Sequence, residues 1–178
     1  AMGALRGGSG LVFLGVPECI YEIEAVKLTE PIVFPLPDNG GKLSESAVAS
    51  VAEMLPRMDA VLIGPGLGVS EGTLAVVQSV LTQAQCPVVV DADGINLLAQ
   101  HMDILRERHA PTILTPHAGE FARIGGDNAG DRGQKTANFA KEYGCILLLK
   151  GHETLITDGE TMYRNQTGNP GMATGGSG

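Results

Sequence analysis

The chain has 178 residues, of which 43% are hydrophobic and 18% charged, a balance typical of one globular domain spanning residues 1–178. Its 12 basic residues face 20 acidic ones, for a net charge of −8, and they form no basic stripe. This argues against a nucleic acid or an anionic membrane as partner. It allows a phosphorylated small molecule, because glycine turns and helix N-termini bind phosphate with few lysines.

The three cysteines, Cys19, Cys86 and Cys145, are widely spaced and form no C-x-x-C pair. We interpret them as buried thiols in a reducing compartment rather than as a disulfide or a metal site. The sequence has neither a run of about 18 apolar residues nor the pattern of a signal peptide, which predicts a cytoplasmic protein.

The first third of the chain contains both strand and helix patterns. The apolar run at residues 10–17 predicts a buried strand, and residues 18–27 have apolar side chains at helical spacing. Residues 31–36 predict a strand at a sheet edge, because their prolines cannot donate to a neighbouring strand. Ser44 is then expected to cap a helix over residues 45–55.

The rest of the chain alternates more regularly. Residues 59–68 predict a strand and a glycine turn, after which Ser70 caps a helix. Residues 87–99 and 111–124 each predict a strand, a turn and a helix, and residues 145–165 end in a β-hairpin with an Asp-Gly turn. This alternation predicts an α/β layered fold with a mainly parallel sheet.

Unusual turns follow these strands, where ligands of such folds bind. The turn GPGLG at residues 64–68 is neither the dinucleotide fingerprint nor a phosphate loop ending in Gly-Lys-Ser/Thr, so by itself it is as compatible with a tight connection as with a site. In DADG, Asp93 is expected to cap the next helix. For Asp91 a structural role and contact with a ligand or hydrated Mg²⁺ both stay open.

Two further side chains follow predicted strands. A single histidine is usually structural or exposed, but His117 stands between a strand and a helix, where the ligand crevice is expected. Lys150 ends an apolar strand and is followed directly by glycine. We favour phosphate contact for this lysine over simple extension into solvent.

The closing turn, NPGMATGGSG, is the densest cluster of glycine in the sequence. Consecutive backbone N–H groups in such a turn can surround an anion without any lysine. The predicted anion hole consists of Gly175, Gly176, Ser177 and Gly178.

Taken in order, six stretches of the chain resemble the ADP/ATP-dependent NAD(P)H-hydrate dehydratases. The stretches are GLVFLGVPE, VLIGPGLG, PVVVDADGINLLA, ILTPHAGEFARI, LLLKGHETLI and NPGMATGGSG. Each is weak alone, but together they cover nearly the whole chain. The resemblance implies a ribokinase-like, three-layer α/β/α fold. It also implies a repair enzyme that uses ADP or ATP, with Mg²⁺, to phosphorylate the hydroxyl of hydrated NADH or NADPH (NADHX or NADPHX), after which loss of phosphate restores the cofactor.

The same resemblance implies roles for single residues. Gly66 and His117 match positions that contact the hydrated dinucleotide. The positions that match nucleotide contacts are Lys150, Gly151, His152, Glu153, Thr154 and Gly178. In the family an aspartate that follows the final turn is the catalytic base, so the base is expected directly after Gly178.

The resemblance also implies that the chain lacks the beginning of the family's first strand and helix and the helices after the closing turn. We therefore expect the chain alone to be inactive and to expose a sheet face that favours homo-oligomers. Two alternatives stay open. A ribokinase-like kinase of the hydroxyethylthiazole kinase type would leave a stable phosphorylated product, and a non-catalytic remnant would at most bind nucleotide.

Overall fold

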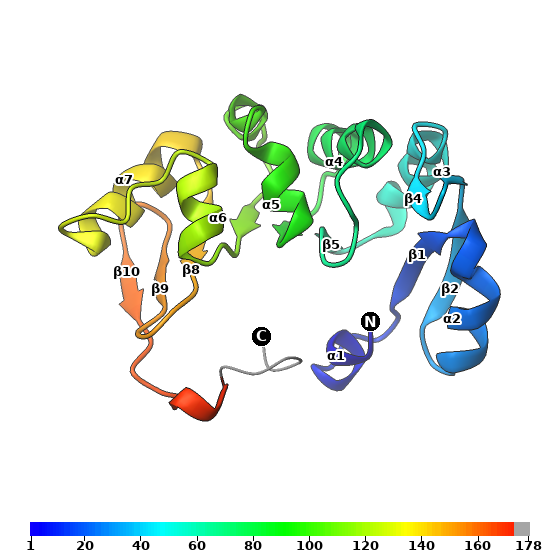
Figure 1. Ribbon diagram of the computed structural model, residues 1–178, viewed down its shortest axis with the longest axis horizontal. Helices are drawn as coiled ribbons and strands as arrows, with labels where there is room; N and C mark the ends of the chain where they lie inside the picture. The colour runs from blue at the N-terminus through cyan, green and yellow to red at the C-terminus, as the bar shows by residue number, and fades with distance from the viewer. Residues whose placement is uncertain (173–178) are drawn as a thin grey trace.

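The structure is a computed structural model that describes residues 1–172 of the chain (Figure 1). Helices and strands alternate through most of it. In chain order they are α1 (Met2–Arg6), β1 (Phe13–Pro17), α2 (Tyr21–Lys27), β2 (Ile32–Leu36), β3 (Asp38–Asn39), β4 (Lys42–Leu43), α3 (Ala47–Met54), β5 (Val61–Ile63), α4 (Glu71–Gln83), β6 (Val88–Val90), α5 (Asp93–Leu98), β7 (Thr112–Leu114), α6 (Ala118–Arg123), α7 (Arg132–Tyr143), β8 (Ile146–Leu149), β9 (Leu155–Thr157) and β10 (Met162–Arg164). Short 3-10 turns are η1 (Glu18–Ile20), η2 (Leu55–Arg57), η3 (Met102–Leu105) and η4 (Pro170–Met172).

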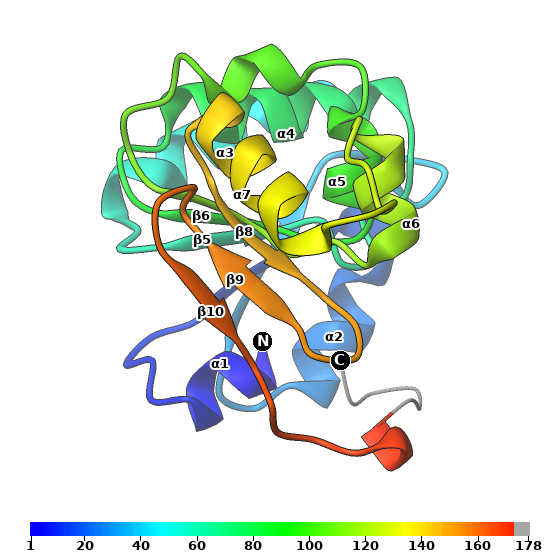
Figure 2. The same ribbon diagram turned by 90° about the vertical axis from the view of Figure 1, so that its left-hand side faces the viewer.

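The main sheet has the strand order β10-β9-β8-β7-β6-β5. Strands β5 to β8 run parallel, and β9 and β10 add an antiparallel hairpin to β8. Helices α4 to α7 lie along one face of this sheet (Figures 1 and 2). The predicted α/β arrangement, with a mainly parallel sheet and a late hairpin, is therefore confirmed.

The first two predicted strands form a small sheet of their own. β1 and β2 pair in parallel, and β2 is an edge strand, as its prolines predict. The prediction that the first strand is buried is wrong, because Val16 is the one residue of β1 that reaches full burial. The helix predicted after it is present as α2, but its apolar residues face solvent, with Ile23 63% and Val26 84% exposed.

The core lies between the main sheet and its helices. Every parallel strand contributes buried apolar side chains to it, and these are Ile63, Val88, Val90, Leu114, Leu147 and Leu149. Successive strand residues point to opposite faces, so the residues between them lie on the other face. There Leu62, paired in register with Val89, is 62% exposed. Within residues 1–172, the helical layer of the main sheet therefore covers one face.

Two predicted caps have different outcomes. Ser70 caps α4 as predicted, because its hydroxyl accepts the Thr73 N–H and the Thr73 hydroxyl accepts the Ser70 N–H. The prediction for Ser44 is wrong, since α3 begins at Ala47 after Ser46. Ser44 instead donates to the carbonyl of Pro37 and shares a hydrogen bond with Ser46.

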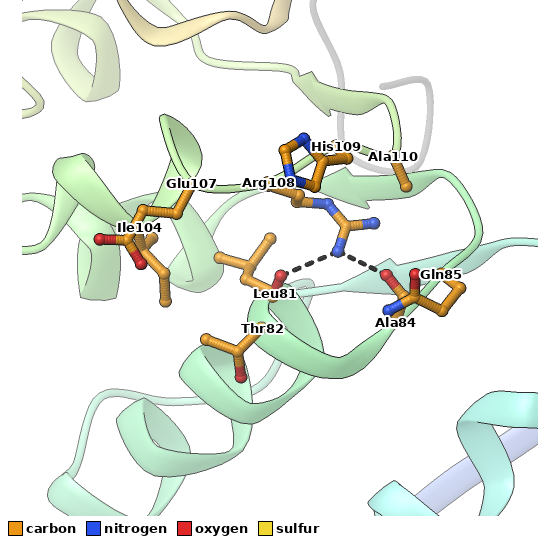
Figure 3. A pocket seen from close by; sticks show the side chains of 9 residues that line it. All are labelled: Leu81, Thr82, Ala84, Gln85, Ile104, Glu107, Arg108, His109 and Ala110. Atoms are coloured by element: carbon orange, nitrogen blue, oxygen red, sulfur yellow. Dashed lines mark hydrogen bonds between the residues drawn. The ribbon is translucent and has the colours of Figure 1, made fainter.

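A single arginine joins several elements at the amino ends of the parallel strands (Figure 3). Nη1 of Arg108 donates to the carbonyls of Leu81 and Ala84, both at 2.8 Å, at the end of α4. Nη2 donates to the carbonyl of Cys86, and Nε donates to Thr112 Oγ1 at 2.9 Å. Because partial burial disfavours its charge, the pKa of Arg108 is lowered from its ordinary value. The guanidinium thus satisfies carbonyls that the end of a helix leaves without partners.

The cysteines differ in environment. Cys145 is buried, Cys86 is partly buried and Cys19 is exposed, and all three are free thiols. The interpretation as buried thiols is therefore right for Cys145 and wrong for Cys19.

None of the helices described in residues 1–172 has the length and apolar character that crossing a bilayer requires.

Candidate active site

The GPGLG turn, residues 64–68, packs directly on the turn that follows β6. Gly64 has φ +123°, and a Cβ added there would lie 1.8 Å from the carbonyl oxygen of Asp91. The Asp91 N–H donates to the carbonyl of Ile63 at 3.1 Å, and the Asp91 carbonyl accepts the Gly94 N–H at 3.0 Å. The two turns therefore form one closely packed unit at the carboxyl ends of β5 and β6.

Asp93 links these turns in a way that the sequence did not predict. It was expected to cap α5, but the N-cap is Ala92, and the Asp93 carboxylate accepts the Gly68 N–H at 2.8 Å. Gly66 lies at the exposed tip of the turn, with φ +69°, and a Cβ there would have no neighbour within 4 Å among the described residues. The backbone at Gly66 is thus accessible to a ligand.

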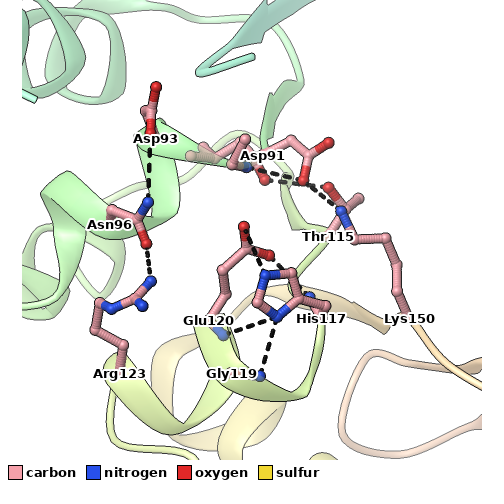
Figure 4. Close-up of polar contacts among 11 residues, drawn as sticks. Asp91, Asp93, Asn96, Thr115, His117, Gly119, Glu120, Arg123 and Lys150 are labelled. Carbon is pink, nitrogen blue, oxygen red and sulfur yellow. Dashed lines mark hydrogen bonds and ion pairs between the residues drawn. The ribbon is translucent and has the colours of Figure 1, made fainter. Parts of the chain in front are cut away.

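Asp91 and Lys150 form an ion pair across the carboxyl edge of the sheet (Figure 4). Lys150 Nζ lies 2.7 Å from Asp91 Oδ1, which also accepts the Ala92 N–H at 2.8 Å. Lys150 follows β8 and Asp91 follows β6, so the lysine side chain reaches past the end of β7, where Thr115 stands. The side chains of Lys150 and Asp91 remain 36% and 28% exposed.

The charge state of Asp91 follows from these contacts. Partial burial is the largest single influence and acts to raise its pKa, but the hydrogen bonds from Lys150 and Thr115 and the positive charge of Lys150 together outweigh it. The net result is a pKa below the ordinary value, so Asp91 is a carboxylate at neutral pH. An anionic ligand at this edge would meet an ammonium group that already has one anionic partner.

His117 caps α6, which begins directly after it. Its Nδ1 accepts the N–H groups of Gly119 and Glu120 at 3.0 and 3.2 Å, and Glu120 Oε2 accepts the His117 N–H at 2.8 Å. An accepting Nδ1 places the proton of the neutral ring on Nε2. Nε2 lies 3.4 Å from Glu120 Oε1, and the imidazole is 58% exposed while the Glu120 side chain is 8% exposed. His117 therefore combines a structural cap with a ring edge that can donate to a ligand.

The two candidate residues His117 and Lys150 lie side by side. They form an isolated parallel bridge beyond the ends of β7 and β8, and the Lys150 N–H donates to the carbonyl of Pro116 at 2.8 Å. The structure thus brings His117, Lys150 and Asp91 to one edge of the sheet (Figure 4). The GPGLG turn lies at the same edge, beyond the carboxyl end of β5. These residues therefore lie together at the carboxyl ends of the strands, as their positions in the sequence predict.

The turn over Gly151, His152, Glu153 and Thr154 connects β8 to β9. It is held by Arg132, whose guanidinium donates to the carbonyls of Leu149, Lys150 and His152. Thr154 Oγ1 donates to the carbonyl of Gly151, while Glu153, at φ +54°, pairs with Arg164. The exposed side chain of His152 lies on the same turn.

Three supporting residues were not found from the sequence. Arg132 and Thr115 support the turn and the ion pair described above, and Asn96 accepts a hydrogen bond from Arg123 beside Asp93. Thr115 directly follows a predicted strand, next to His117, and this position could have identified it as a site residue. Arg132 is the first residue of a polar helix, and nothing in the sequence there indicates a role at the site.

An apolar cavity of about 330 Å³ opens beside the GPGLG turn. Its walls come from β1, β2, α3, α4, β5 and the turn itself, including Pro65 and Leu67.

The predicted anion hole, formed by Gly175, Gly176, Ser177 and Gly178, lies outside the described residues. The same holds for the nucleotide contact predicted for Gly178.

The family model for NAD(P)H-hydrate dehydratase matches residues 1–178. The chain belongs to this family. Curated relatives agree with the assignment. A protein of Moorella thermoacetica named bifunctional NAD(P)H-hydrate repair enzyme Nnr is 44% identical over the whole chain, and one of the same name from Salinibacter ruber is 38% identical. The alignments cover 35% and 34% of those proteins, so this dehydratase-family chain spans about a third of their length.

Solved structures show the same fold. The ADP/ATP-dependent NAD(P)H-hydrate dehydratase of Bacillus subtilis, co-crystallised with ATP and Mg²⁺, is 28% identical with a TM-score of 0.75, over 98% of this chain and 60% of that one. A ribokinase-like superfamily protein of Enterococcus faecalis has a TM-score of 0.81 at 24% identity, over 97% of this chain and 58% of that one. The ribokinase-like fold predicted for this NAD(P)H-hydrate dehydratase family member is confirmed.

Proposed function

We propose that this chain provides the substrate- and nucleotide-binding edge of an ADP/ATP-dependent NAD(P)H-hydrate dehydratase. The terminal phosphoryl group of ADP or ATP passes to the hydroxyl oxygen of NADHX or NADPHX, and the hydroxyl proton passes to a base. The C–O bond then breaks, inorganic phosphate leaves, and a proton is lost from the neighbouring carbon. The products are NADH or NADPH, the shortened nucleotide and phosphate.

One observation carries the proposal. His117 and Lys150 form a backbone bridge at the carboxyl edge of adjacent strands, so one ligand pair can contact both residues at once. This agrees with a reaction in which a phosphoryl group moves between two bound molecules, since such transfer depends mainly on positioning and charge neutralisation.

Each residue of the edge has a definite task in this proposal. Lys150 contacts a phosphate of the nucleotide, and the turn from Gly151 to Thr154, held by Arg132, contacts the rest of it. Gly66 gives the hydrated dinucleotide close access to the backbone, and His117 donates from Nε2. The anion hole at residues 175–178 and the aspartate expected directly after Gly178 complete the proposal, the latter as the base.

Magnesium enters this proposal together with the nucleotide. Within residues 1–172, no group of three or more His, Cys, Asp or Glu side chains is placed to hold a metal ion. Mg²⁺ in phosphate sites typically needs one or two carboxylates besides phosphate oxygens and water. Asp93 can supply that carboxylate while Asp91 stays paired with Lys150, so the edge fits Mg²⁺ held mainly by the nucleotide. When bound, the ion neutralises phosphate charge.

The test follows the absorbance of reduced nicotinamide while the protein is supplied with NADHX or NADPHX, ADP or ATP, and Mg²⁺. It is run on the chain itself and on a form extended through the expected aspartate and the helices after it. Recovery of NADH with release of inorganic phosphate in the extended form is the expected result. Replacing the added aspartate with asparagine should slow this recovery by about 10²–10⁴-fold.

Other outcomes favour the alternatives. A stable phosphorylated product would indicate a kinase, for which a hydroxyethylthiazole kinase of Pyrococcus horikoshii, at 17% identity and a TM-score of 0.54, provides a fold precedent alone. Nucleotide binding without turnover in the extended form would indicate a non-catalytic module. No binding and no turnover would refute the proposed function.

The proposal also includes a homo-oligomer and a cytoplasmic location. Exposed apolar side chains on α2 and on the open face of the main sheet, such as Val26 and Leu62, support self-association. Free thiols at all three cysteines support a reducing compartment. Light scattering on the purified chain tests the oligomer, and a single-chain mass across concentrations would contradict it.

A further inference from the structure

The contact between Asp91 and Lys150 has consequences for the proposed function, on which the following inference rests. A lysine side chain at a strand end has many rotamers and ordinarily extends into solvent. Here it crosses the end of β7 to reach a carboxylate two strands away, at 2.7 Å. The partner carboxylate therefore fixes where the positive charge stands.

Asp91 is unusually well held for this task. Its backbone N–H and C=O bond to Ile63 and Gly94, and its carbonyl fills the space that Gly64 leaves by having no side chain. The carboxylate accepts the N–H of Ala92, which has φ +49°, a backbone conformation that non-glycine residues rarely adopt. A strained neighbour kept in place by its surroundings is typical of a functional turn.

Lys150 keeps donor capacity beyond this pair. An ammonium group has three N–H donors, and one of them is directed at Asp91 Oδ1. The side chain is 36% exposed, so a phosphate can approach the remaining donors. His117 stands next to Lys150 in the backbone bridge, and the ion pair with Asp91 puts the ammonium over the end of β7.

We propose that Asp91 is a positioning residue that holds the Lys150 ammonium over the end of β7, where it contacts the nucleotide phosphates next to His117. Asp91 affects phosphate binding through Lys150 and makes no contact of its own with the nucleotide. Its negative charge favours the placement of the ammonium more than it repels the phosphates. This gives Asp91 of the DADG turn, whose role the sequence leaves open, a definite function.

A double-mutant cycle measured by calorimetry tests this inference, with ADP as the probe and EDTA present to remove Mg²⁺. We expect Lys150→Ala to weaken ADP binding about tenfold or more, as for the loss of a charge-assisted hydrogen bond. Asp91→Ala should weaken it about three- to tenfold, and the double variant should bind like Lys150→Ala alone. Asp91→Asn keeps an oxygen acceptor for Lys150 and should recover part of the loss.

The control variant is Asp103→Ala, which removes the same charge from an exposed position in η3, before β7 rather than after it. It should bind ADP like the unaltered chain. Circular dichroism on every variant checks folding, and if Asp91→Ala does not fold, the cycle is completed with Asp91→Asn.

Several results would overturn the inference. If Asp91→Ala weakens ADP binding equally with and without Lys150, then Asp91 contacts the nucleotide directly. If Asp91→Ala strengthens binding, then Asp91 competes with phosphate for the lysine. If ADP binds and Asp91→Ala has no effect, then the ion pair does not position the lysine. If the unaltered chain binds no ADP, the nucleotide part of the proposed function fails as well, and the inference falls with it.

Discussion

Replacing Gly64 with alanine should disrupt two turns of the candidate site at once. Gly64 has φ +123°, where an alanine is strained. The new Cβ would lie 1.8 Å from the Asp91 carbonyl oxygen and 2.8 Å from the Gly94 nitrogen, whereas Cβ atoms essentially never come within 3.0 Å of such atoms. Both neighbours are backbone, so no side chain can rotate away to make room.

The expected loss of stability can be worked out from these two effects. Backbone strain of this kind costs about 1–3 kcal/mol. Moving the Asp91 turn by more than about 1 Å adds an overpacking cost of about 1–3 kcal/mol. Together the variant should lose about 2–6 kcal/mol in its free energy of unfolding. Since a small domain unfolds with a urea dependence of about 1–3 kcal/mol per molar, the midpoint should fall by at least about 0.7 M.

Urea unfolding followed by circular dichroism measures this loss, and Gly66→Ala is the matched control. Gly66 also has positive φ, +69°, but a Cβ there has no described neighbour within 4 Å. Its cost should be the strain alone, about 1–2 kcal/mol. Gly66→Ala should nevertheless weaken binding of NADHX, because it fills the accessible tip of the turn. Equal urea midpoints for the two variants would refute the argument from close approach.

Three more predictions follow from other parts of the structure. Arg108→Met should lower the free energy of unfolding by about 2 kcal/mol or more in urea unfolding, whereas Arg106→Met, at an exposed ion pair, should cost less than about 1 kcal/mol. The folded-state pKa of Asp91 lies below its ordinary value of 3.8, so its contribution to stability is present above pH 3.8 and is lost as the pH falls through the lower folded value. The stability difference between the chain and Asp91→Asn should therefore shrink in acid, and a difference constant with pH would contradict this. Burial raises the pKa of the Cys145 thiol to about 12, so a thiol-alkylating reagent should modify exposed Cys19 in the folded chain and Cys145 only after unfolding, as read by mass spectrometry.

Short apolar runs bounded by turns, alternating with helical patterns, predicted the main sheet. The runs VLI and VVV of β5 and β6 are apolar throughout, so the sequence did not reveal that Ile63 and Val90 point into the helical core while Leu62 is exposed on the other face. The exposed apolar side chains of α2 could not be predicted in the same way. Helical spacing reveals an apolar face, but it does not reveal whether anything packs against it.

The caps show a second limit of the sequence. Ser70 was predicted correctly because serine followed by a run of helix formers leaves few other positions for the helix start. Asp93 was assigned the same role on the same grounds, yet its carboxylate accepts a hydrogen bond from Gly68 of the neighbouring turn. A local rule cannot detect a competing donor 25 residues away in the chain.

For the candidate site, the sequence predicted which residues gather at the edge but not how they interact. Lys150 and His117 were assigned to the same edge of the sheet because both follow strands, and the bridge between them confirms that they lie side by side there. The pairing of Lys150 with Asp91 spans 59 residues and two strand positions. It depends on the strand order and on how closely Gly64 lets the Asp91 turn approach, and neither can be derived from a single motif.

The dual role of His117 links the fold of this edge to its chemistry. Nδ1 can accept the N–H groups at the start of α6 only while it carries no proton, so the cap and the donor at Nε2 belong to the same neutral ring. Removing the ring therefore affects both stability and ligand contact. In the substitution His117→Asn, the asparagine can still cap the helix, but its side chain is too short to place a donor where Nε2 of His117 lies. A site that uses a capping residue in this way keeps the ring oriented from within one helix, because the N–H groups of Gly119 and Glu120 hold Nδ1 and the Glu120 carboxylate lies 3.4 Å from Nε2.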